Sequence, residues 1–413
     1  MPDSSHIWHP YTRFSALDAA DPLVIDRAEG IHLYDRFGRA YLDAISSWWC
    51  VNLGHSRPEI IFAIQEQAAK LQHSILGNLA HPGALALAER IAGLMPTPDR
   101  RVMFASDGAC ANEAALKIAV QYYHNQGRPE KCRFVALSNP YHGDTLGAVS
   151  VGYMQGFHQP FRPLLFETFV AEPSIESLSR VITGHAKELA GLILEPLCQG
   201  AAGMRIYPAE VLHAAAALCK SHDILLIVDE IAMGFGRTGS MFAFEQAGID
   251  PDIVTLGKAL SNGTLPISAC VTQDRIYETF SDLGEADHSF YHGHTFAGNP
   301  IACAAAIASL DIYAREPIIQ NLGSKAVSMA AGFESFKELP AVKEVRCLGM
   351  IAAVELRDER AMPAIRARLL NDDILVRPLG PVLYLAPPLI TSEADLLMLI
   401  DAIHHAIAAE TRV

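Results

Sequence analysis

The sequence has few charged residues and no apolar run long enough to cross a membrane. Only 19% of its 413 residues are Asp, Glu, Lys or Arg, below the roughly 25% of an average soluble domain, and half are apolar. This composition excludes a disordered chain and favours a large, well-buried α/β or α+β protein. The longest apolar runs, such as 301–308, fall far short of the ~20 residues that a membrane span requires. Basic residues are scarce as well, and the net charge of −14 argues against nucleic acid as a partner.

Closely spaced cysteines are also missing. The eight cysteines are single, and no two are closer than 21 residues, which excludes zinc ribbons and C-x-x-C redox motifs. We therefore expect reduced thiols. Residues 1–10 lack the basic and apolar regions of a secretory signal, so we expect a cytoplasmic protein. His288, His292 and His294 have a spacing that metal ligands could have, but no carboxylate pair accompanies them, and we expect no metal site.

Short apolar runs alternate with helical patterns through the middle of the chain. Most of these runs are continuous rather than alternating, which is typical of parallel strands buried on both faces. The pattern predicts a doubly wound α/β domain with a mostly parallel central sheet. The predicted strands are 101–106, 134–138, 192–194, 225–229, 253–256 and 267–271, and the predicted helices are 111–124, 209–222 and 300–314.

The last ~90 residues mix short strands with helices and predict a smaller α+β domain. We expect paired strands within 345–356, a strand at 382–385 and a final helix from 393 to about 409. The chain therefore divides into an N-terminal segment (1–45) that packs on the small domain or on a partner subunit, a large domain (46–320) and a small domain (321–413).

Two predicted strands end in ionisable residues. Asp229 and Glu230 close the run 225–229, and Lys258 follows the run 253–256. Ligands of open α/β sheets bind at the carboxyl ends of the strands. Burial would lower the pKa of Lys258 and make it a nucleophilic amine suited to a Schiff base. An acidic pair at a strand end can equally be a helix cap or part of a solvated loop.

The pairing of Asp229 with Lys258 suggests a pyridoxal phosphate site. Lys258 would carry the cofactor, and Asp229 would keep its pyridine nitrogen protonated. Gly108 and Ala109 open a predicted helix after a strand, a suitable place for a phosphate. Tyr141 could stack over the cofactor ring, although ordinary loop packing is the simpler explanation for an aromatic residue there. Thr295 could donate to the phosphate.

In this order, these segments resemble the class III (fold-type I) pyridoxal phosphate aminotransferases over nearly the whole chain. The combination of Asp-Glu-Ile (229–231), Gly-Phe-Gly-Arg-Thr-Gly (234–239) and Gly-Lys-Ala-Leu-Ser-Asn-Gly (257–263) is specific. The resemblance implies a homodimer, in which the residue that matches Thr295 reaches the neighbouring subunit's cofactor. It implies a cofactor site formed by Gly108, Ala109, Tyr141, His142, Asp229, Ile231, Lys258 and Thr295.

Further motifs narrow the resemblance to the biotin-pathway branch of that family. They are Trp-His-Pro-Tyr-Thr (8–12), Ser-Ser-Trp-Trp (46–49), Tyr-His-Gly-Asp-Thr (141–145) and Val-Arg-Pro-Leu-Gly (376–380). That branch transfers an amino group from S-adenosylmethionine to 8-amino-7-oxononanoate. The resemblance implies a catalytic role for Lys258, Asp229 and Tyr11, and a substrate site formed by Tyr11, Trp48, Trp49, Tyr141, Asp144, Arg237, Gly293, Arg377 and Tyr384.

These residue types suit the two substrates. Arg377 can bind the carboxylate of the keto acid in a bidentate manner, and the tryptophans can wall its methylene chain. Packing in the core is the alternative for Trp48 and Trp49, and adjacent residues of a strand face opposite sides, so we expect at least one to be structural. A surface ion pair is the alternative for Arg377.

The sequence departs from the family in two places, and other functions stay open. Ala109 lacks the hydroxyl that the phosphate loop usually carries, which concerns cofactor affinity more than cofactor identity, and His294 stands where the biotin-pathway branch often has proline. The competing interpretations are lysine as the donor, another class III aminotransferase acting on an ω-amino acid or diamine, and a catalytically silent relative. A nicotinamide dehydrogenase is disfavoured because no G-x-G-x-x-G opens a strand–helix unit with an acidic partner ~20 residues later.

Overall fold

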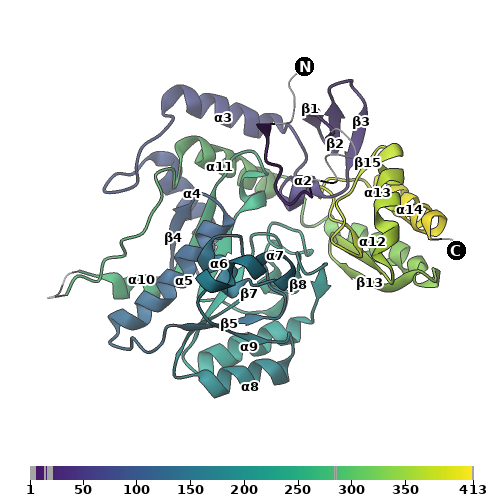
Figure 1. Ribbon diagram of the computed structural model, residues 1–413. Coiled ribbons are helices and arrows are strands. Elements are labelled where there is room, and N and C mark those ends of the chain that lie inside the picture. Colours follow the sequence, from purple (N-terminus) through teal and green to yellow (C-terminus); the bar gives the residue numbers. More distant parts are fainter. Residues whose placement is uncertain (1–5, 14, 16–21, 283, 285, 412–413) are drawn as a thin grey trace.

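A seven-stranded sheet forms the centre of the molecule in the computed structural model (Figure 1), which describes residues 6–411 except 14, 16–21, 283 and 285. The strand order is β4-β12-β11-β10-β7-β5-β6. The bounds are β4 Arg100–Ala105, β5 Arg133–Leu137, β6 Thr168–Ala171, β7 Leu189–Leu194, β10 Leu225–Asp229, β11 Ile253–Leu256 and β12 Ser268–Gln273. Every residue of β7, β10 and β11 is buried.

The central sheet is mostly parallel, as predicted, with one antiparallel strand. The run 267–271 has the same continuous apolar pattern as its neighbours, and β12 pairs antiparallel with both β11 and β4. A continuous apolar run reports burial on both faces and carries no information on direction. The other neighbouring strands of this sheet are parallel, as predicted.

Helices cover both faces of the sheet. Alternate residues of β7 and β10 belong to two separate cores: Ile193 and Ile227 pack with α5 (Gly108–Asn125), whereas Leu192 and Leu226 pack into the larger cluster on the other side. This alternation follows from the period of two along a strand. The larger cluster contains residues of α3 Pro58–Lys70, α4 Pro82–Gly93, α8 Ile175–His185, α9 Ala209–Ser221 and α11 Pro300–Arg315. No helix in the described part of the chain is long and apolar enough to span a membrane.

The C-terminal part forms a second, smaller layer beside the large sheet, at the right of Figure 1. Its antiparallel sheet has the order β13-β14-β16, and helices pack against it. The bounds are β13 Val342–Leu348, β14 Ile351–Leu356, β16 Val382–Leu385, α12 Leu322–Glu334, α13 Met362–Asn371 and α14 Glu393–Glu410. The paired strands, the strand at 382–385 and the last helix are confirmed.

A four-stranded sheet joins the two ends of the sequence. Its order is β1-β2-β3-β15, with β1 Ile25–Glu29, β2 His32–Asp35, β3 Ala40–Asp43 and β15 Ile374–Leu375. The short strand β15 pairs in parallel with β3. The segment before residue 45 is thus tied to the C-terminal part of the chain. The division at residues 45 and 320 stays a prediction.

The remaining elements are short and lie mainly in connections. They are α2 Ser46–Trp49, α6 Leu146–Val151, α7 Gln155–His158, α10 Asp274–Tyr277, β8 Cys198–Gln199, β9 Arg205–Ile206 and the 3-10 turns η2 Gln159–Leu164, η3 Ala243–Ala247, η4 Lys258–Ser261, η5 Glu278–Phe280, η6 Ser335–Glu338 and η7 Glu359–Ala361. The eight cysteines form no disulfides.

The turn between β13 and β14 makes a close contact with the large domain. Gly349 has a φ of +54°, and a Cβ built there would lie 2.3 Å from the carbonyl carbon of Thr238. We expect Gly349→Ala to lower the free energy of unfolding by at least about 2 kcal/mol, because it adds a left-handed strain and a clash with backbone. The measurement is the midpoint of thermal unfolding.

The matched control is Gly323→Ala on α12, where the added Cβ meets nothing within 4 Å. That substitution should leave the midpoint unchanged or raise it, because alanine within a helix is more favourable than glycine by roughly 0.5–1 kcal/mol. Equal midpoints for the two variants would contradict the proposed close contact.

Candidate active site

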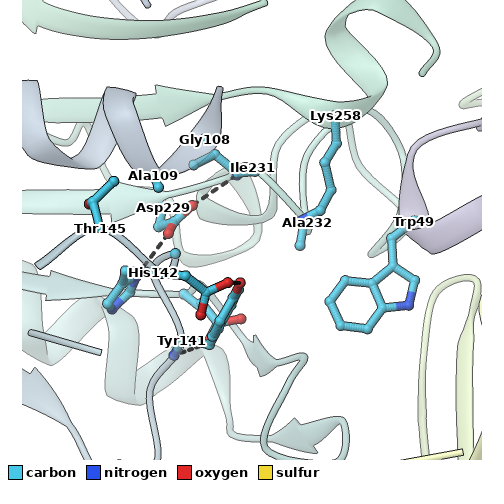
Figure 2. A pocket seen from close by; sticks show the side chains of 13 residues that line it. Trp49, Gly108, Ala109, Tyr141, His142, Thr145, Asp229, Ile231, Ala232 and Lys258 are labelled. Atoms are coloured by element: carbon cyan, nitrogen blue, oxygen red, sulfur yellow. Dashed lines mark hydrogen bonds and ion pairs between the residues drawn. The ribbon is translucent and has the colours of Figure 1, made fainter. Parts of the chain in front are cut away.

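A cavity of about 440 Å³ lies at the carboxyl edge of the central sheet (Figure 2). Its volume is within the ~300–1,000 Å³ of small-molecule sites. Nine of its lining residues are among those predicted from the sequence: Trp49, Gly108, Ala109, Tyr141, His142, Asp144, Asp229, Ile231 and Lys258. Four others were not predicted: Gly143, Thr145, Glu195 and Ala232. These groups follow β4, β5, β7, β10 and β11, so one edge of the sheet assembles the site, apart from Trp49.

Lys258 extends into this cavity from the turn that follows β11 (Figure 2). The turn gives Lys258 a φ of +45°, an unfavourable conformation for a residue with a side chain. Burial lowers the pKa of its amine, and the nearby Asp229 carboxylate opposes that shift. The Nζ atom lies 5.4 Å from the centre of the Trp49 ring. The structure thus holds a buried amine with increased nucleophilic character.

Asp229 is held by two side chains from neighbouring elements. Its Oδ2 atom accepts hydrogen bonds from Nδ1 of His142 and from Nδ2 of Asn112, each at 2.8 Å. Asn112 is itself fixed by the Thr255 hydroxyl, which donates to its Oδ1 at 2.8 Å. The carboxylate is only 4% exposed. Nδ1 of His142 faces this carboxylate, and its buried Nε2 has no hydrogen-bond partner among the described residues.

Glu195 is a buried acid that the sequence analysis did not single out. It follows β7 directly, accepts hydrogen bonds from the amides of Gly200 at 3.0 Å and Tyr141 at 3.3 Å, and lines the cavity. Burial raises its pKa to about 7, and the Asp229 charge adds to the shift, whereas His142 opposes it. Glu195 could have been predicted from the sequence, because it shows the pattern that identified Asp229, an acidic residue at the end of an apolar strand.

The first turn of α5 forms one wall of the cavity. Asp107 caps this helix by accepting the amide of Cys110 at 2.9 Å, and Gly108 and Ala109 face the cavity. Gly143 packs so closely on Ala109 that a Cβ there would lie 2.3 Å from the alanine Cβ. The first amides of a helix have no intrahelical acceptor and point at this space, which suits an anion such as a phosphate.

Two tyrosines and Asp144 form a hydrogen-bonded group beside the cavity. The Tyr11 hydroxyl donates to Oδ1 of Asp144 at 2.5 Å, and the Tyr141 hydroxyl donates to Oδ2 at 2.8 Å. Burial and the Asp144 carboxylate together raise the pKa of Tyr11 to about 12. Tyr11 therefore stays a hydrogen-bond donor at neutral pH.

The two tryptophans lie in a left-handed turn and not in a strand. Four consecutive non-glycine residues, 46–49, have φ values between +45° and +81°. In this turn Trp49 faces the cavity and donates from its indole nitrogen to the Tyr384 hydroxyl at 3.1 Å. Trp48 stacks under the Arg377 guanidinium, 3.5 Å from the ring centre. Among the described residues no carboxylate pairs with Arg377, so the alternative of a surface ion pair does not account for its position.

The structure does not bring Arg237 to the cavity. Its guanidinium is 1% exposed and donates to the carbonyls of Pro387 and Met350, to Oδ1 of Asn52 and to the hydroxyl of Ser46, at 2.6–3.3 Å. These contacts commit the side chain to binding the 46–49 turn to the C-terminal part of the chain. We therefore propose a structural role for Arg237, and its assignment to the substrate site stays a prediction.

Gly293 and Thr295 also lie away from the cavity of their own chain. Both are exposed and neither lines the cavity. A role at the site requires a second copy of the chain. No group of three His, Cys, Asp or Glu side chains in the described residues is arranged to hold a metal ion.

Comparison with known proteins agrees with this geometry. The sequence pattern of class III aminotransferases matches residues 15–407. The chain belongs to the class III aminotransferases. The adenosylmethionine-8-amino-7-oxononanoate aminotransferase of Geobacter sulfurreducens is 38% identical over 99% of this chain and 97% of that protein, and the one from Synechococcus elongatus is 40% identical over 96% and 97%.

Solved structures of aminotransferases share the fold. The crystal structure of adenosylmethionine-8-amino-7-oxononanoate aminotransferase from Methanocaldococcus jannaschii has a TM-score of 0.96 and 38% identity, and covers 99% of this chain and 98% of that one. A transaminase from a marine Virgibacillus has a TM-score of 0.92 and 28% identity, with the same coverage. The chain is thus a pyridoxal phosphate enzyme of fold type I.

The residues present fit that cofactor. The buried Lys258 amine, the Asp229 carboxylate fixed by two hydrogen bonds, and the helix start at Gly108 and Ala109 match its aldehyde, its pyridine nitrogen and its phosphate, respectively. His142, which holds Asp229, lines the same cavity. We propose these residues as the cofactor site of this aminotransferase.

The structural role of Arg237 can be tested by Arg237→Met. The variant leaves buried carbonyl and amide oxygens without donors, so we expect the free energy of unfolding to fall by at least about 2 kcal/mol. Thermal unfolding measures the loss. Arg315→Met is the control, since Arg315 forms only surface ion pairs and should shift the midpoint little. A normal midpoint for Arg237→Met with weaker binding of one substrate would restore the substrate-binding assignment.

Proposed function

We propose that this chain transfers an amino group from S-adenosylmethionine to 8-amino-7-oxononanoate in biotin biosynthesis, giving 7,8-diaminononanoate. The full-length similarity to aminotransferases with those printed substrates supports this assignment. The observation that carries it is the Arg377 guanidinium over the Trp48 ring. It has no acidic partner in the described residues and lies outside a cavity whose walls carry Asp144, Glu195 and Asp229. The arrangement suits a molecule with an amine at one end and a carboxylate at the other.

Pyridoxal phosphate supplies an electron sink for negative charge that develops at the carbon bearing the amine. The residues of this chain then hold and move protons and orient the substrate. With its amine free, Lys258 would take a proton from that carbon through Nζ and deliver it to the carbon of the cofactor's aldehyde, and it would move a proton in the opposite direction for the keto acid. Burial suits the amine to this role by lowering its pKa. Asp229, fixed by His142 and Asn112, keeps a negative charge at the far end of the cavity.

The remaining residues of the proposed site orient the two substrates in turn. Arg377 would bind the carboxylate of the keto acid, and Trp49 would pack against its methylene chain. Asp144, with the hydroxyls of Tyr11 and Tyr141, would bind the ammonium end. The sulfonium of S-adenosylmethionine would lie against the face of one of the aromatic rings of this site. Both substrates use one site in sequence, as in a ping-pong transamination.

We also propose that the active enzyme is a homodimer in a reducing compartment such as the cytoplasm. Gly293 and Thr295 are exposed, and the adjacent Phe296 is 64% exposed, as is Leu79 at 57%. A second copy could cover these apolar side chains and receive Thr295 at its own cofactor phosphate. The free cysteines fit a reducing compartment. Sedimentation of the purified holoenzyme tests the dimer.

The amino transfer is tested by separate half-reactions. We expect S-adenosylmethionine to remove the visible absorbance of the Lys258-bound cofactor and 8-amino-7-oxononanoate to restore it. Loss with lysine alone would change the donor and keep the product. Loss with 4-aminobutyrate, without recovery by the keto acid, would move the chain to the ω-aminotransferases. Lys258→Ala should abolish both the absorbance and turnover, and near-normal turnover in that variant would refute the proposed role.

The role of Arg377 is tested by Arg377→Met. Methionine keeps an apolar side chain beside Trp48 and removes the charge and the N–H donors of the guanidinium, so we expect KM for 8-amino-7-oxononanoate to rise about 10- to 100-fold with little change in kcat. Arg360→Met is the control, because that arginine is exposed on η7 and pairs only with the adjacent Asp358. An unchanged KM in Arg377→Met would place the substrate carboxylate elsewhere.

A further inference from the structure

A buried histidine supports Asp144 from the side away from the cavity. His158 ends α7 and is 2% exposed, and it is not among the residues that line the cavity. Its Nε2 atom lies 3.4 Å from Oδ1 of Asp144. The two residues are fourteen positions apart, so the contact depends on the fold of the loop after β5. Neither the sequence motifs nor the site described above account for His158.

The hydrogen bonds fix which ring nitrogen of His158 carries the proton. Nδ1 accepts the backbone amide of Met154 at 3.1 Å, so this nitrogen has a lone pair and no hydrogen. In the neutral ring the proton must then lie on Nε2, which faces the Asp144 carboxylate. His158 is thus a donor to Asp144 and an acceptor for its own segment at the same time.

Asp144 receives three donors from three segments of the chain. Tyr11 comes from the N-terminal segment and bonds Oδ1, Tyr141 comes from the loop after β5 and bonds Oδ2, and His158 approaches Oδ1 from α7. A carboxylate on a half-exposed side chain can rotate about its last bond, and the tyrosine hydroxyls turn with it. The His158 ring is the only one of the three donors that is almost fully buried.

We propose that His158 is a positioning residue that fixes the rotation of the Asp144 carboxylate, and through it the two tyrosine hydroxyls that bind the ammonium end of the substrate. The proposal rests on the function proposed above, since it concerns the same site. His158 acts only through Asp144. It should therefore affect binding of 8-amino-7-oxononanoate more than the rate of the chemical step.

Packing of α7 is the competing explanation for a buried histidine. His158 also contacts the rings of Tyr153 and Phe157, with centroids 6.3 and 6.2 Å away, and Phe157 in turn lies against Tyr11. Substitution of His158 by glutamine or by asparagine distinguishes a positioning role from a packing role. The Nε2 of glutamine coincides with Nε2 of histidine and keeps the donor to Asp144, whereas the Oδ1 of asparagine coincides with Nδ1 and keeps only the acceptor for Met154.

The test compares His158→Asn with His158→Gln in the second half-reaction, from the aminated holoenzyme to 8-amino-7-oxononanoate. We expect His158→Asn to raise KM for the keto acid about tenfold, the effect of one lost hydrogen bond to a charged group, with kcat within about twofold of the unchanged enzyme. His158→Gln should stay within about threefold in KM. Equal KM values in all three proteins, or an equal rise in both variants, would overturn the proposal.

Crystal structures of the two holoenzyme variants provide a readout that needs no substrate. We expect the Asp144 carboxylate to be rotated in His158→Asn, with the bond to Tyr11 or Tyr141 broken, and unrotated in His158→Gln. An unrotated carboxylate in His158→Asn would also overturn the proposal. If the unchanged enzyme takes no amine from S-adenosylmethionine, the proposed function fails, and the Asp144 rotation still decides the role of His158.

Discussion

The site depends on the desolvation of one amine at the edge of a sheet that is buried on both faces. Lys258 follows β11 and forms no ion pair with the described residues, and burial of its amine lowers its pKa. The same edge raises the pKa of Glu195 to about 7. The Asp229 carboxylate at the same edge is instead fixed by two hydrogen bonds, from His142 and Asn112.

A second constraint is the left-handed turn at residues 46–49. Each non-glycine residue in that conformation costs roughly 1–2 kcal/mol, so the turn persists only because its surroundings determine it. Arg237 bonds the Ser46 hydroxyl, which in turn donates to the Ala386 carbonyl, and the Ser47 hydroxyl donates to Asp43. The result is that adjacent tryptophans diverge, with one at the cavity wall and the other under Arg377. Strain and a buried arginine thus place the aromatic residues of the proposed substrate site.

Features that depend on local sequence could be predicted, and features that depend on long-range contacts could not. The apolar runs predicted the central strands. The acids and the lysine at the ends of these runs predicted the cavity, because the carboxyl ends of parallel strands lie at the same edge of a sheet. The direction of β12 could not be predicted, because burial on both faces carries no information on strand direction. The position of Arg237 outside the cavity could not be predicted either, because its partners Pro387 and Met350 lie more than a hundred residues away. The contact of His158 with Asp144, fourteen residues earlier, could not be predicted either. It depends on the path of a loop, and a loop has no periodic sequence pattern.

The distribution of charge in the site follows from which part of the chain supplies each group. The carboxylates of Asp229, Glu195 and Asp144 come from strand ends and loops of the large sheet, so the cavity wall favours a cation. Arg377 comes from the segment after β15, which pairs with β3 and belongs to neither the large sheet nor its helices. The proposed substrate site therefore takes its acidic groups and its basic group from two different parts of the chain. For the proposed keto acid, whose ammonium and carboxylate are separated by a methylene chain, this division favours an orientation with the carboxylate at Arg377 and the ammonium at the acidic wall.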